Sequence, residues 1–335
     1  MLDAKSLPLL SGGNNLLAFS GGGDSTALFF LLLRENIPFD LAHVNYRTRF
    51  QSDKEAAYAR TLADRYGKRC HVYDAEPIRG NFEAEARRIR YDFFESVIAE
   101  HGYERLLTAH QLDDRLEWLL MQLCKGAGLP EMLGTEGITE RGNYTLVRPL
   151  LECSRSQLRS WLAQEGISYF EDESNRDERH LRNRFRRAYA EPLLEAYGSG
   201  IRKSLRYLTQ DAQALQFQPP SESSGRVLML KTPAKRLELM RAVDRWLKQN
   251  GYLMRQGEKE RVMEENELVI GRRHALSVTP VCTLLTPAAD AVMPKNFKEQ
   301  CRTLGIGPNV RPYLYTDPAT FEWVKSQLLS WQREA

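Results

Sequence analysis

A glycine-rich turn between an apolar run and a helical pattern restricts the fold of this chain more than any other feature. The apolar run covers residues 15–20, three glycines follow, and residues 24–34 carry apolar side chains at helical spacing. Glycine permits backbone angles that other residues avoid and lets the chain approach a ligand closely. A strand, a glycine turn and a helix in this order predict a unit of an α/β fold whose helix N-terminus can face an anion.

The same alternation continues along the first half of the chain. Short loops separate the expected elements, with strands over 40–45, 69–73 and 105–109 and helices over 53–66, 83–100 and 113–124. This alternation predicts the α/β class: a doubly wound, mostly parallel, Rossmann-like sheet with helices on both faces. Ligands of such sheets bind at the carboxyl ends of the strands, which is where the glycine turn lies.

A helical segment and a second domain are expected after this sheet. Residues 126–147 are expected to form a loop that closes on a strand over 144–147. Helices are expected over 154–164, over a basic stretch 179–197 that the glycines at 198 and 200 break, and then to about 215. The Pro/Ser-rich stretch 216–225 is typical of a linker. We therefore expect one domain over 1–215, with a basic helical extension from about 150, and a smaller α+β domain over 216–335. In the smaller domain we expect helices over 233–249 and 318–331 and strands near 267–270, 274–278 and 281–285.

Composition and charge exclude several classes of protein. Among 335 residues 42% are apolar and the net charge is only +3, so the chain is expected to be globular, and its charge alone does not indicate a nucleic-acid partner. The longest apolar run, 27–33, is far shorter than the ~20 residues that span a bilayer, and the N-terminus lacks a signal-peptide pattern. Five scattered cysteines without a Cys-x-x-Cys pair disfavour disulfides and structural zinc. We therefore expect a cytoplasmic protein with no membrane segment.

Residues 20–25, Ser-Gly-Gly-Gly-Asp-Ser, have the chemistry of a polyphosphate-binding loop. Their backbone N–H groups and the hydroxyls of Ser20 and Ser25 are donors, and the following helix adds a favourable partial charge. Asp24 is unusual beside phosphates, and a carboxylate there indicates a bridging Mg²⁺. The alternative is a glycine turn that caps a helix and binds nothing. The loop is neither a Gly-Lys-Ser/Thr loop nor a Gly-x-Gly-x-x-Gly fingerprint.

A histidine and three carboxylates recur at helical spacing after the expected strand 105–109. These are His110, Asp113, Asp114 and Glu117, at positions i, i+3, i+4 and i+7, so on a helix they share one face. Carboxylates this close repel one another unless a cation lies among them, and that cation is either Mg²⁺ or an ammonium group of a substrate. The alternative is a solvated acidic helix start, which the helix dipole favours.

Two groups of arginines are further candidate phosphate-binding residues. Arg87 and Arg90 are either ordinary exposed helix residues or neutralise the phosphates of a nucleotide or of RNA. The helical stretch that starts at Arg179 contains four more arginines, Arg182, Arg184, Arg186 and Arg187. Their density indicates a phosphate-binding surface, with a solvated helix face as the alternative.

In its place after the first strand, the loop 20–25 resembles the signature Ser-Gly-Gly-x-Asp-Ser of the PP-loop (N-type) ATP pyrophosphatases. Further stretches, in order and spacing, are similar to one branch of that superfamily, the tRNA(Ile)-lysidine synthetases, over roughly residues 14–195. These stretches are Asn81-x-Glu83 with Ala86-Arg87-Arg88-Ile89-Arg90-Tyr91, Thr108-Ala109-His110-x-x-Asp113-Asp114-x-x-Glu117, Lys125-Gly126-x-Gly128, Arg148-Pro149-Leu150-Leu151 before Arg155, and Glu171-Asp172-x-Ser174-Asn175 before Arg182-Asn183-x-x-Arg186. Residues beyond about 215 contribute nothing to the resemblance.

The resemblance implies a ligase that uses ATP and Mg²⁺ as cofactors and has tRNA(Ile) and free L-lysine as partners. The C2 oxygen of the wobble cytidine would attack the α-phosphate of ATP, and lysine would then displace AMP from the adenylated base, changing the codon read from AUG to AUA. The implied catalytic residues are Asp24, Arg90, His110, Asp113, Asp114 and Glu117, and the implied ATP-binding residues are Ser20, Gly21, Gly22, Gly23, Asp24 and Ser25. The implied contacts to tRNA or substrate are Arg87, Arg148, Asn175, Arg182, Asn183 and Arg186, and the implied Mg²⁺ ligands are Asp24 and Asp113.

This chain departs from the family's usual residues at a few positions. Tyr46 stands where the family usually has histidine, and Cys124 stands where it often has arginine. The acidic set is flanked by Gln111, Arg115 and Trp118, where smaller or neutral residues are expected.

Other functions stay open from the sequence. A tRNA thiolase would share the loop but commonly needs paired cysteines, a small-molecule amide ligase would not need tRNA, and a nucleotide-sensing module would show no turnover. The domain 216–335 is expected to bind tRNA, with a packing or oligomerisation module as the alternative. The oligomeric state is left open, a dimer included.

Overall fold

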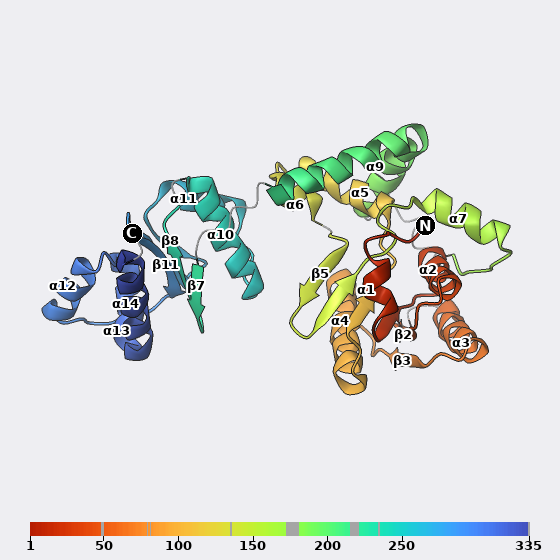
Figure 1. Ribbon diagram of the computed structural model, residues 1–335, viewed down its shortest axis with the longest axis horizontal. Coiled ribbons are helices and arrows are strands. Elements are labelled where there is room, and N and C mark those ends of the chain that lie inside the picture. Colours follow the sequence, from red (N-terminus) through yellow and green to blue (C-terminus); the bar gives the residue numbers. More distant parts are fainter. Residues whose placement is uncertain are drawn as a thin grey trace. The chain divides into compact units, whose positions relative to one another are not determined.

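The computed structural model describes residues 1–47, 50–78, 80, 82–134, 136–171, 181–214, 221–233 and 235–333. The chain divides into two compact units, Met1–Ala214 and Leu215–Ala335, and each is described by itself (Figure 1). Within the described residues, none of the helices is both long and apolar enough to cross a membrane.

A six-stranded sheet forms the centre of the first unit, with the strand order β3-β2-β1-β4-β6-β5. The strands are β1 (Asn15–Ala18), β2 (Asp40–Asn45), β3 (Cys70–Asp74), β4 (Arg105–Leu107), β5 (Ile138–Arg141) and β6 (Tyr144–Val147). All neighbouring pairs are parallel except β5 and β6, which form an antiparallel edge. The predicted doubly wound, mostly parallel sheet is therefore confirmed, and the glycine turn leaves β1 at its carboxyl end.

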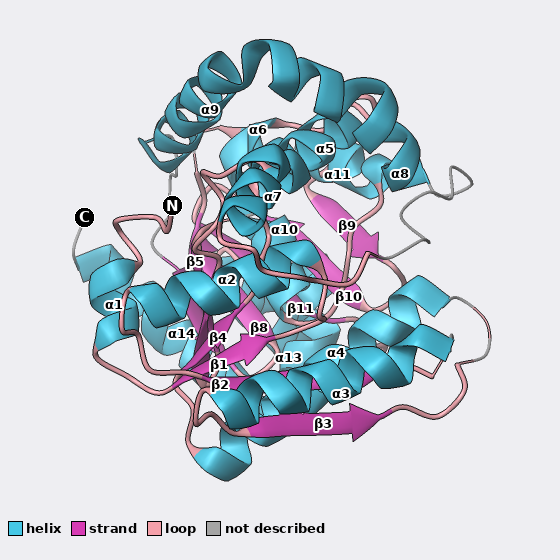
Figure 2. Cartoon of the chain, turned by 90° about the vertical axis from the view of Figure 1, so that its right-hand side faces the viewer, coloured by secondary structure: helices cyan, strands magenta, loops and turns pink. Residues whose placement is uncertain are grey.

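Helices cover both faces of this sheet, as the sequence predicts (Figure 2). They are α2 (Gly23–Arg34), α3 (Phe50–Arg65), α4 (Phe82–His101), α5 (Leu112–Leu123) and α7 (Arg155–Gln164). On one face Leu28 and Ala59 from α2 and α3 pack with Leu158 from α7 in one apolar core. On the other face Phe94 and Ile98 from α4 pack in a second core with strand residues. Burial of both faces explains why the strands read as nearly continuous apolar runs.

The segment after the sheet differs from the prediction in one respect and agrees with it in another. The expected loop over 126–147 contains a short helix, α6 (Leu129–Leu133), and the antiparallel strand β5, neither of which was predicted. After α8 (Leu181–Phe185) and a π-helical turn (Arg186–Ala190), α9 spans Glu191–Ala214. The break expected at 198–200 is present as a kink inside α9 at Tyr197, where φ is −134° and ψ is 19°, directly before Gly198.

The second unit contains a five-stranded antiparallel sheet in the order β7-β8-β11-β10-β9. Its strands are β7 (Ser221–Ser224), β8 (Val227–Lys231), β9 (Glu267–Ile270), β10 (His274–Val278) and β11 (Cys282–Pro287). Its helices are α10 (Arg236–Gln249), α11 (Gln256–Glu264), α12 (Lys295–Thr303), α13 (Arg311–Thr316) and α14 (Pro318–Arg333). One apolar core includes Leu239 and Leu247 of α10, and another includes Val324 and Leu328 of α14. The predicted α+β class holds, but part of the expected linker is the strand β7.

Candidate active site

The glycine turn is a tightly hydrogen-bonded loop at the carboxyl end of β1. The Ser20 backbone N–H donates to Ser25 Oγ (3.2 Å), and Ser25 Oγ donates to the Gly22 carbonyl (3.0 Å). Gly21 has φ +81°, and its carbonyl accepts from the Phe170 N–H (3.0 Å). A Cβ on Gly23 would lie 3.1 Å from the ring of Tyr169. The first two glycines thus shape the turn, and the third lets residues 169–170 approach it.

Two neighbouring glycines of this loop make a matched test of its backbone. Gly21→Ala is expected to destabilise the fold by about 1–2 kcal/mol, because its left-handed φ is strained for a residue with a Cβ. Gly22→Ala is expected to cost less, because its φ is −74° and the nearest atom to an added Cβ is 3.5 Å away. Urea denaturation of the two variants measures the difference, and equal losses would contradict it.

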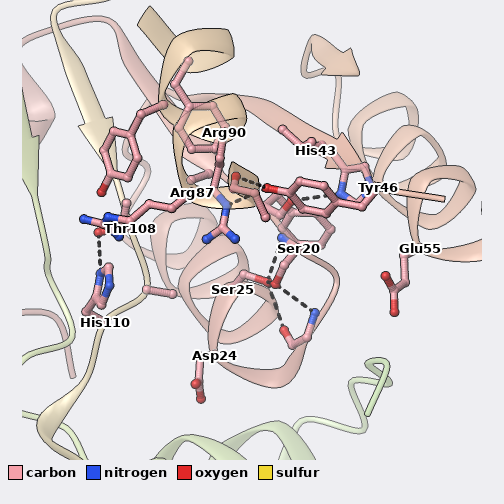
Figure 3. Close-up of a pocket in the computed structure, with 18 of the residues that line it drawn as sticks. Ser20, Asp24, Ser25, His43, Tyr46, Glu55, Arg87, Arg90, Thr108 and His110 are labelled. Atoms are coloured by element: carbon pink, nitrogen blue, oxygen red, sulfur yellow. Dashed lines mark hydrogen bonds between the residues drawn. The ribbon is translucent and has the colours of Figure 1, made fainter. Parts of the chain in front are cut away.

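One side of the loop borders a cavity of about 430 Å³ (Figure 3). His43 and Tyr46 lie on one side of it and Thr108 and His110 on the other. Its polar lining includes residues of the phosphate loop, two arginines of α4, Thr108, His110 and Asp114. Its apolar and aromatic lining comes from β1 and the residue after it, from β2, from α4 and from two loop residues, namely Ala18, Phe19, Val44, Phe82, Ala86, Tyr91, Phe94, Ala109 and Phe170. A cavity with one flat apolar part and one cationic part suits a nucleotide.

A second cavity of about 460 Å³ borders the other side of the same loop. Its lining is strongly charged, with Arg155, Arg159, Arg186 and Arg187 facing carboxylates that include Glu171 and Glu191. Ser20, Gly22, Asp24, Ser25, Asp114 and Phe170 line both cavities. The two spaces therefore share a wall built from the phosphate loop and two carboxylates, Asp24 and Asp114.

The acidic set lies at the start of α5, where its members have different surroundings. Gln111 is the N-cap: its side chain accepts from the Asp113 N–H (2.9 Å), and its own N–H donates to Asp114 Oδ2 (3.0 Å). Asp113 is 4% exposed, its Oδ2 accepts from the Arg155 N–H (2.9 Å), and it lines neither cavity. Glu117 is fully buried and also lines neither cavity. Of the three predicted carboxylates on α5, only Asp114 faces the cavities.

The cations among these carboxylates are arginines of the chain itself, which corrects the expectation that Mg²⁺ or a substrate ammonium is needed there. Arg182 binds Asp114 (2.6 Å) and Glu117 (2.9 Å), and Arg186 binds Glu117 (2.6 Å). Arg155 lies 3.8 Å from Glu117. Although burial alone would raise it, Arg182 and His110 hold the pKa of Asp114 below its usual value. Arg182 and Arg186 therefore pair with carboxylates of α5, and Arg186 also lines the second cavity, while their predicted contact to tRNA or substrate stays a prediction.

Asp24 is the side chain best placed to bind Mg²⁺. Asp113, the other predicted ligand, lines neither cavity. The side chain of Asp24 is 32% exposed, lines both cavities and lies 3.9 Å from Arg155. Burial raises the pKa of Asp24, and the positive charge of Arg155 partly offsets this. Within the described residues no three His, Cys, Asp or Glu side chains converge on one point. Because Mg²⁺ commonly takes one or two carboxylates together with substrate phosphates, Asp24 beside the phosphate loop is sufficient.

His110 lies in the first cavity with its ring held by one neighbour. Thr108 Oγ1 and His110 Nδ1 are 2.9 Å apart. Burial lowers the pKa of His110 to about 4, and nearby arginines act in the same direction. The imidazole is therefore neutral at pH 7 and can donate or accept a hydrogen bond beside a phosphate without adding charge.

The low pKa of His110 predicts a pH dependence of stability. The pKa of His110 is near 6.5 in the unfolded chain and about 4 in the folded chain. Between these values the unfolded chain binds more protons, so the free energy of unfolding falls as the pH drops. His110→Asn is expected to reduce this slope by about 1.4 kcal/mol per pH unit, the value for one proton. Urea denaturation between pH 4 and 6.5 measures it, with His101→Asn at the exposed end of α4 as the control. An unchanged slope in His110→Asn would contradict the prediction.

The remaining predicted contact residues have varied positions. Arg87 and Arg90 are exposed on α4 and line the first cavity, as a phosphate-neutralising role requires. Arg148 is 9% exposed, donates to the Glu136 carbonyl (2.6 Å) and lines neither cavity, so its contacts hold the loop before β5. Asn183 is also 9% exposed. Asn175 lies outside the described residues, as does Asn81.

The departures from the family pattern have structural explanations. Arg115 is 7% exposed and binds Glu152 (3.1 Å) and Thr209 Oγ1 (3.1 Å), which ties α5 to α9. Trp118 Nε1 donates to the Glu131 carbonyl (2.8 Å). Cys124 ends α5 and is exposed, so it adds nothing to either cavity. Gln111 caps α5, as described above. These side chains brace the acidic helix.

Several residues that line the cavities were not predicted as site residues, among them Arg155, His43 and Thr108, and also Tyr46, Phe82 and Phe170. Arg155 lies between Asp24, Glu117 and Glu191, at 3.9, 3.8 and 3.3 Å. Its place just after the N-cap of α7, inside a recognised stretch, was the available signal. His43 and Thr108 line the first cavity from the ends of β2 and β4. Their position at the carboxyl ends of predicted strands was the signal for them.

Comparison with known proteins agrees with this arrangement. A family model described as a PP-loop domain matches residues 5–193. The tRNA(Ile)-lysidine synthase of Wolinella succinogenes is 42% identical over 304 residues, which cover 90% of this chain and 93% of the relative. That of Helicobacter pylori is 40% identical, over 95% of this chain and 94% of the relative.

Among solved structures, a U34-tRNA thiolase from Methanococcus maripaludis has a TM-score of 0.51 at 16% identity. The match covers 64% of this chain and 76% of the thiolase, and it supports the fold alone. By its matching domain and its full-length relatives, the chain belongs to the tRNA(Ile)-lysidine synthase family of PP-loop proteins.

Proposed function

We propose that this chain is an ATP-dependent ligase that joins the ε-amine of free L-lysine to C2 of the wobble cytidine of tRNA(Ile), forming lysidine and changing the codon read from AUG to AUA. The observation that carries the proposal is that two cavities meet at one phosphate loop and one carboxylate pair, Asp24 and Asp114. This arrangement suits a two-step ligation, because the base can react first with a nucleotide in one cavity and then with an amine from the other cavity. The substrates follow from the name of the relatives, tRNA(Ile)-lysidine synthase.

The first step takes place in the cavity that contains Arg87 and Arg90. The C2 oxygen of cytosine attacks the α-phosphate of ATP, the bond to the β-phosphate breaks, and pyrophosphate leaves. The loop N–H groups with Ser20 and Ser25 hold the phosphates, and the two arginines offset charge on the leaving group. Mg²⁺ bound at Asp24 would add to this charge compensation.

The second step uses the charged cavity. The lysine amine attacks C2, the bond to the oxygen of AMP breaks, and AMP leaves. The ammonium group must first lose a proton, and a carboxylate can accept it. The carboxylates that line this cavity are Asp24, Asp114, Glu171 and Glu191, and of these Asp114 already pairs with Arg182. Asp114 contributes negative charge that attracts the ammonium group.

A thiolase reaction is disfavoured by the cysteines. All five are free, and only Cys124 is exposed. None lines either cavity. A sulfur carrier would need a reactive, accessible thiolate beside the nucleotide.

We further propose that the unit 215–335 contributes to tRNA binding and that the protein acts in the cytoplasm, where its tRNA substrate is. Truncation after residue 214 is expected to weaken tRNA binding while the first unit, which has its own cores, keeps binding ATP. Equal tRNA affinity of the truncated and full chains would instead favour a packing or oligomerisation role.

Pyrophosphate release from ATP tests the proposed function directly. Purified protein is assayed with and without bulk tRNA, and with each amino acid in turn, while incorporation of the amino acid into tRNA is followed. We expect release and incorporation to need both tRNA and lysine. Release that ignores tRNA would indicate a small-molecule ligase, and tight ATP binding without turnover would indicate a nucleotide sensor.

A further inference from the structure

Two aromatic rings stand at the outer end of the first cavity. Phe82, at the start of α4, is 44% exposed although it is a large apolar side chain. Its ring meets that of Tyr46 edge to face, with centroids 5.9 Å apart and an interplanar angle of 67°. Both line the cavity, where Phe19 and Phe94 are each only 3% exposed and Tyr91 and Phe170 are half-buried. Phe82 therefore leaves a flat face uncovered at the entrance.

Hydrogen bonds fix the ring of Tyr46 and the arginine beside it. Tyr46 Oη donates to the Ala86 carbonyl (2.8 Å) and accepts from Arg90 Nε (3.0 Å). The Arg90 guanidinium lies 5.8 Å from the centroid of the same ring, on the wall of the cavity (Figure 3). Because Nε is the atom engaged by Tyr46, the terminal nitrogens of Arg90 are left for an oxygen of a ligand.

The backbone after Tyr46 is held in an uncommon conformation. Arg47 has φ +50°, which an L-residue with a side chain rarely adopts. Asn45 Oδ1 accepts from the Arg47 N–H (3.0 Å), and Arg47 Nη2 binds Asp74 (3.0 Å). Asn45 Nδ2 in turn donates to Asp53 (2.8 Å) and Asp74 (3.0 Å). Strain that the surroundings enforce in this way is concentrated at functional sites, and here it lies directly after Tyr46, which lines the cavity.

We propose that Tyr46 and Phe82 form the aromatic surface on which the wobble cytosine stacks, with Arg90 fixed beside this surface. This inference rests on the proposed function and deepens it. An exposed aromatic face next to a guanidinium is the usual surface on which proteins stack a single-stranded base. The base of a tRNA arrives attached to a large molecule and must bind at the exposed end, whereas a free nucleotide can enter the buried end beside Phe19 and Phe94.

The test uses an anticodon stem-loop RNA that carries the fluorescent cytidine analogue pyrrolo-cytidine at the wobble position. Stacking quenches this base, so binding to the wild-type chain is expected to lower its fluorescence, and saturating ATP is expected to leave the quenching in place. Phe82→Ala is expected to weaken RNA binding about 10-fold and to remove the quenching, because the stacking partner is lost. Phe82→Trp is expected to restore both, and Phe82→Leu, which is apolar but not flat, to restore neither.

Tyr73→Ala is the matched control. Tyr73 is 41% exposed and its ring stacks on Phe93 outside both cavities, so quenching and RNA affinity are expected to equal the wild type. Quenching that survives in Phe82→Ala would overturn the assignment while leaving the proposed function intact. Loss of quenching on addition of ATP would do the same, because it would show that the adenine of ATP stacks on this aromatic surface. A wild-type chain that does not bind the stem-loop would overturn both.

Discussion

Replacing Asp24 with asparagine is expected to abolish pyrophosphate release while leaving the chain folded. Asp24 lines both cavities, and its carboxylate is the protein group placed to bind Mg²⁺ beside the phosphates. Asparagine keeps the size of the side chain but removes the negative charge. Loss of a single preorganised charge-stabilising group costs about 10²–10³-fold in rate.

Stability is expected to change little in this variant, because the side chain is 32% exposed and its ion-pair distance to Arg155 is long, at 3.9 Å. Asp64→Asn, on the exposed side of α3, makes the same chemical change away from the site and is expected to keep full activity. The measurement is the rate of pyrophosphate release with tRNA and lysine, together with the urea midpoint. Near-normal turnover in Asp24→Asn would remove Asp24 from the mechanism.

The largest loss of stability is expected from Glu117→Gln. Glu117 is fully buried, and its two oxygens bind Arg182 and Arg186 at 2.9 and 2.6 Å, with Arg155 at 3.8 Å. A neutral amide leaves these guanidiniums close together without their shared counter-charge. Removing one partner of a buried ion pair costs about 3–5 kcal/mol, and we expect the lower end because Arg182 is 45% exposed and can turn to water.

Arg186 and Arg187 line the charged cavity, so we also expect a loss of activity in Glu117→Gln as these arginines move. Glu195→Gln, exposed on α9, is the control and is expected to leave the urea midpoint unchanged. A Glu117→Gln protein as stable as the wild type would show that the arginines are balanced by other groups.

The first-unit sheet could be predicted from the sequence because its signals are local. The strands over 40–45 and 144–147 have the predicted bounds, since apolar runs between turn residues are enough to define them. The kink of α9 at Tyr197 could also be predicted, because Gly198 and Gly200 weaken the helix locally. The strand β7 was missed because four polar residues pair with β8 only in the folded sheet.

In the site, too, local motifs could be predicted from the sequence and contacts between distant residues could not. The phosphate loop and the acidic helix are short motifs, and both occupy the expected edge of the sheet. Arg182 and Arg186, which neutralise these carboxylates, lie 65 to 69 positions further along the chain, so sequence spacing gave no sign of the pairing between Arg182 and Glu117. Asp113 shares the helix start with Asp114, yet the N–H of Arg155 takes up its carboxylate. These pairings depend on how α7 and α8 pack, and that packing is not encoded in a local pattern.

The wall shared by the two cavities has a thermodynamic consequence. Because Asp24 and Asp114 face both spaces, the charge of a molecule bound in one changes the electrostatic potential felt in the other. The two binding equilibria are therefore linked, and linkage is reciprocal: the factor by which ATP changes the affinity for lysine must equal the factor by which lysine changes the affinity for ATP. Under the proposed function, a cationic amino acid and a polyanionic nucleotide on opposite sides of these two carboxylates would form a cooperative pair, each helping to retain the other.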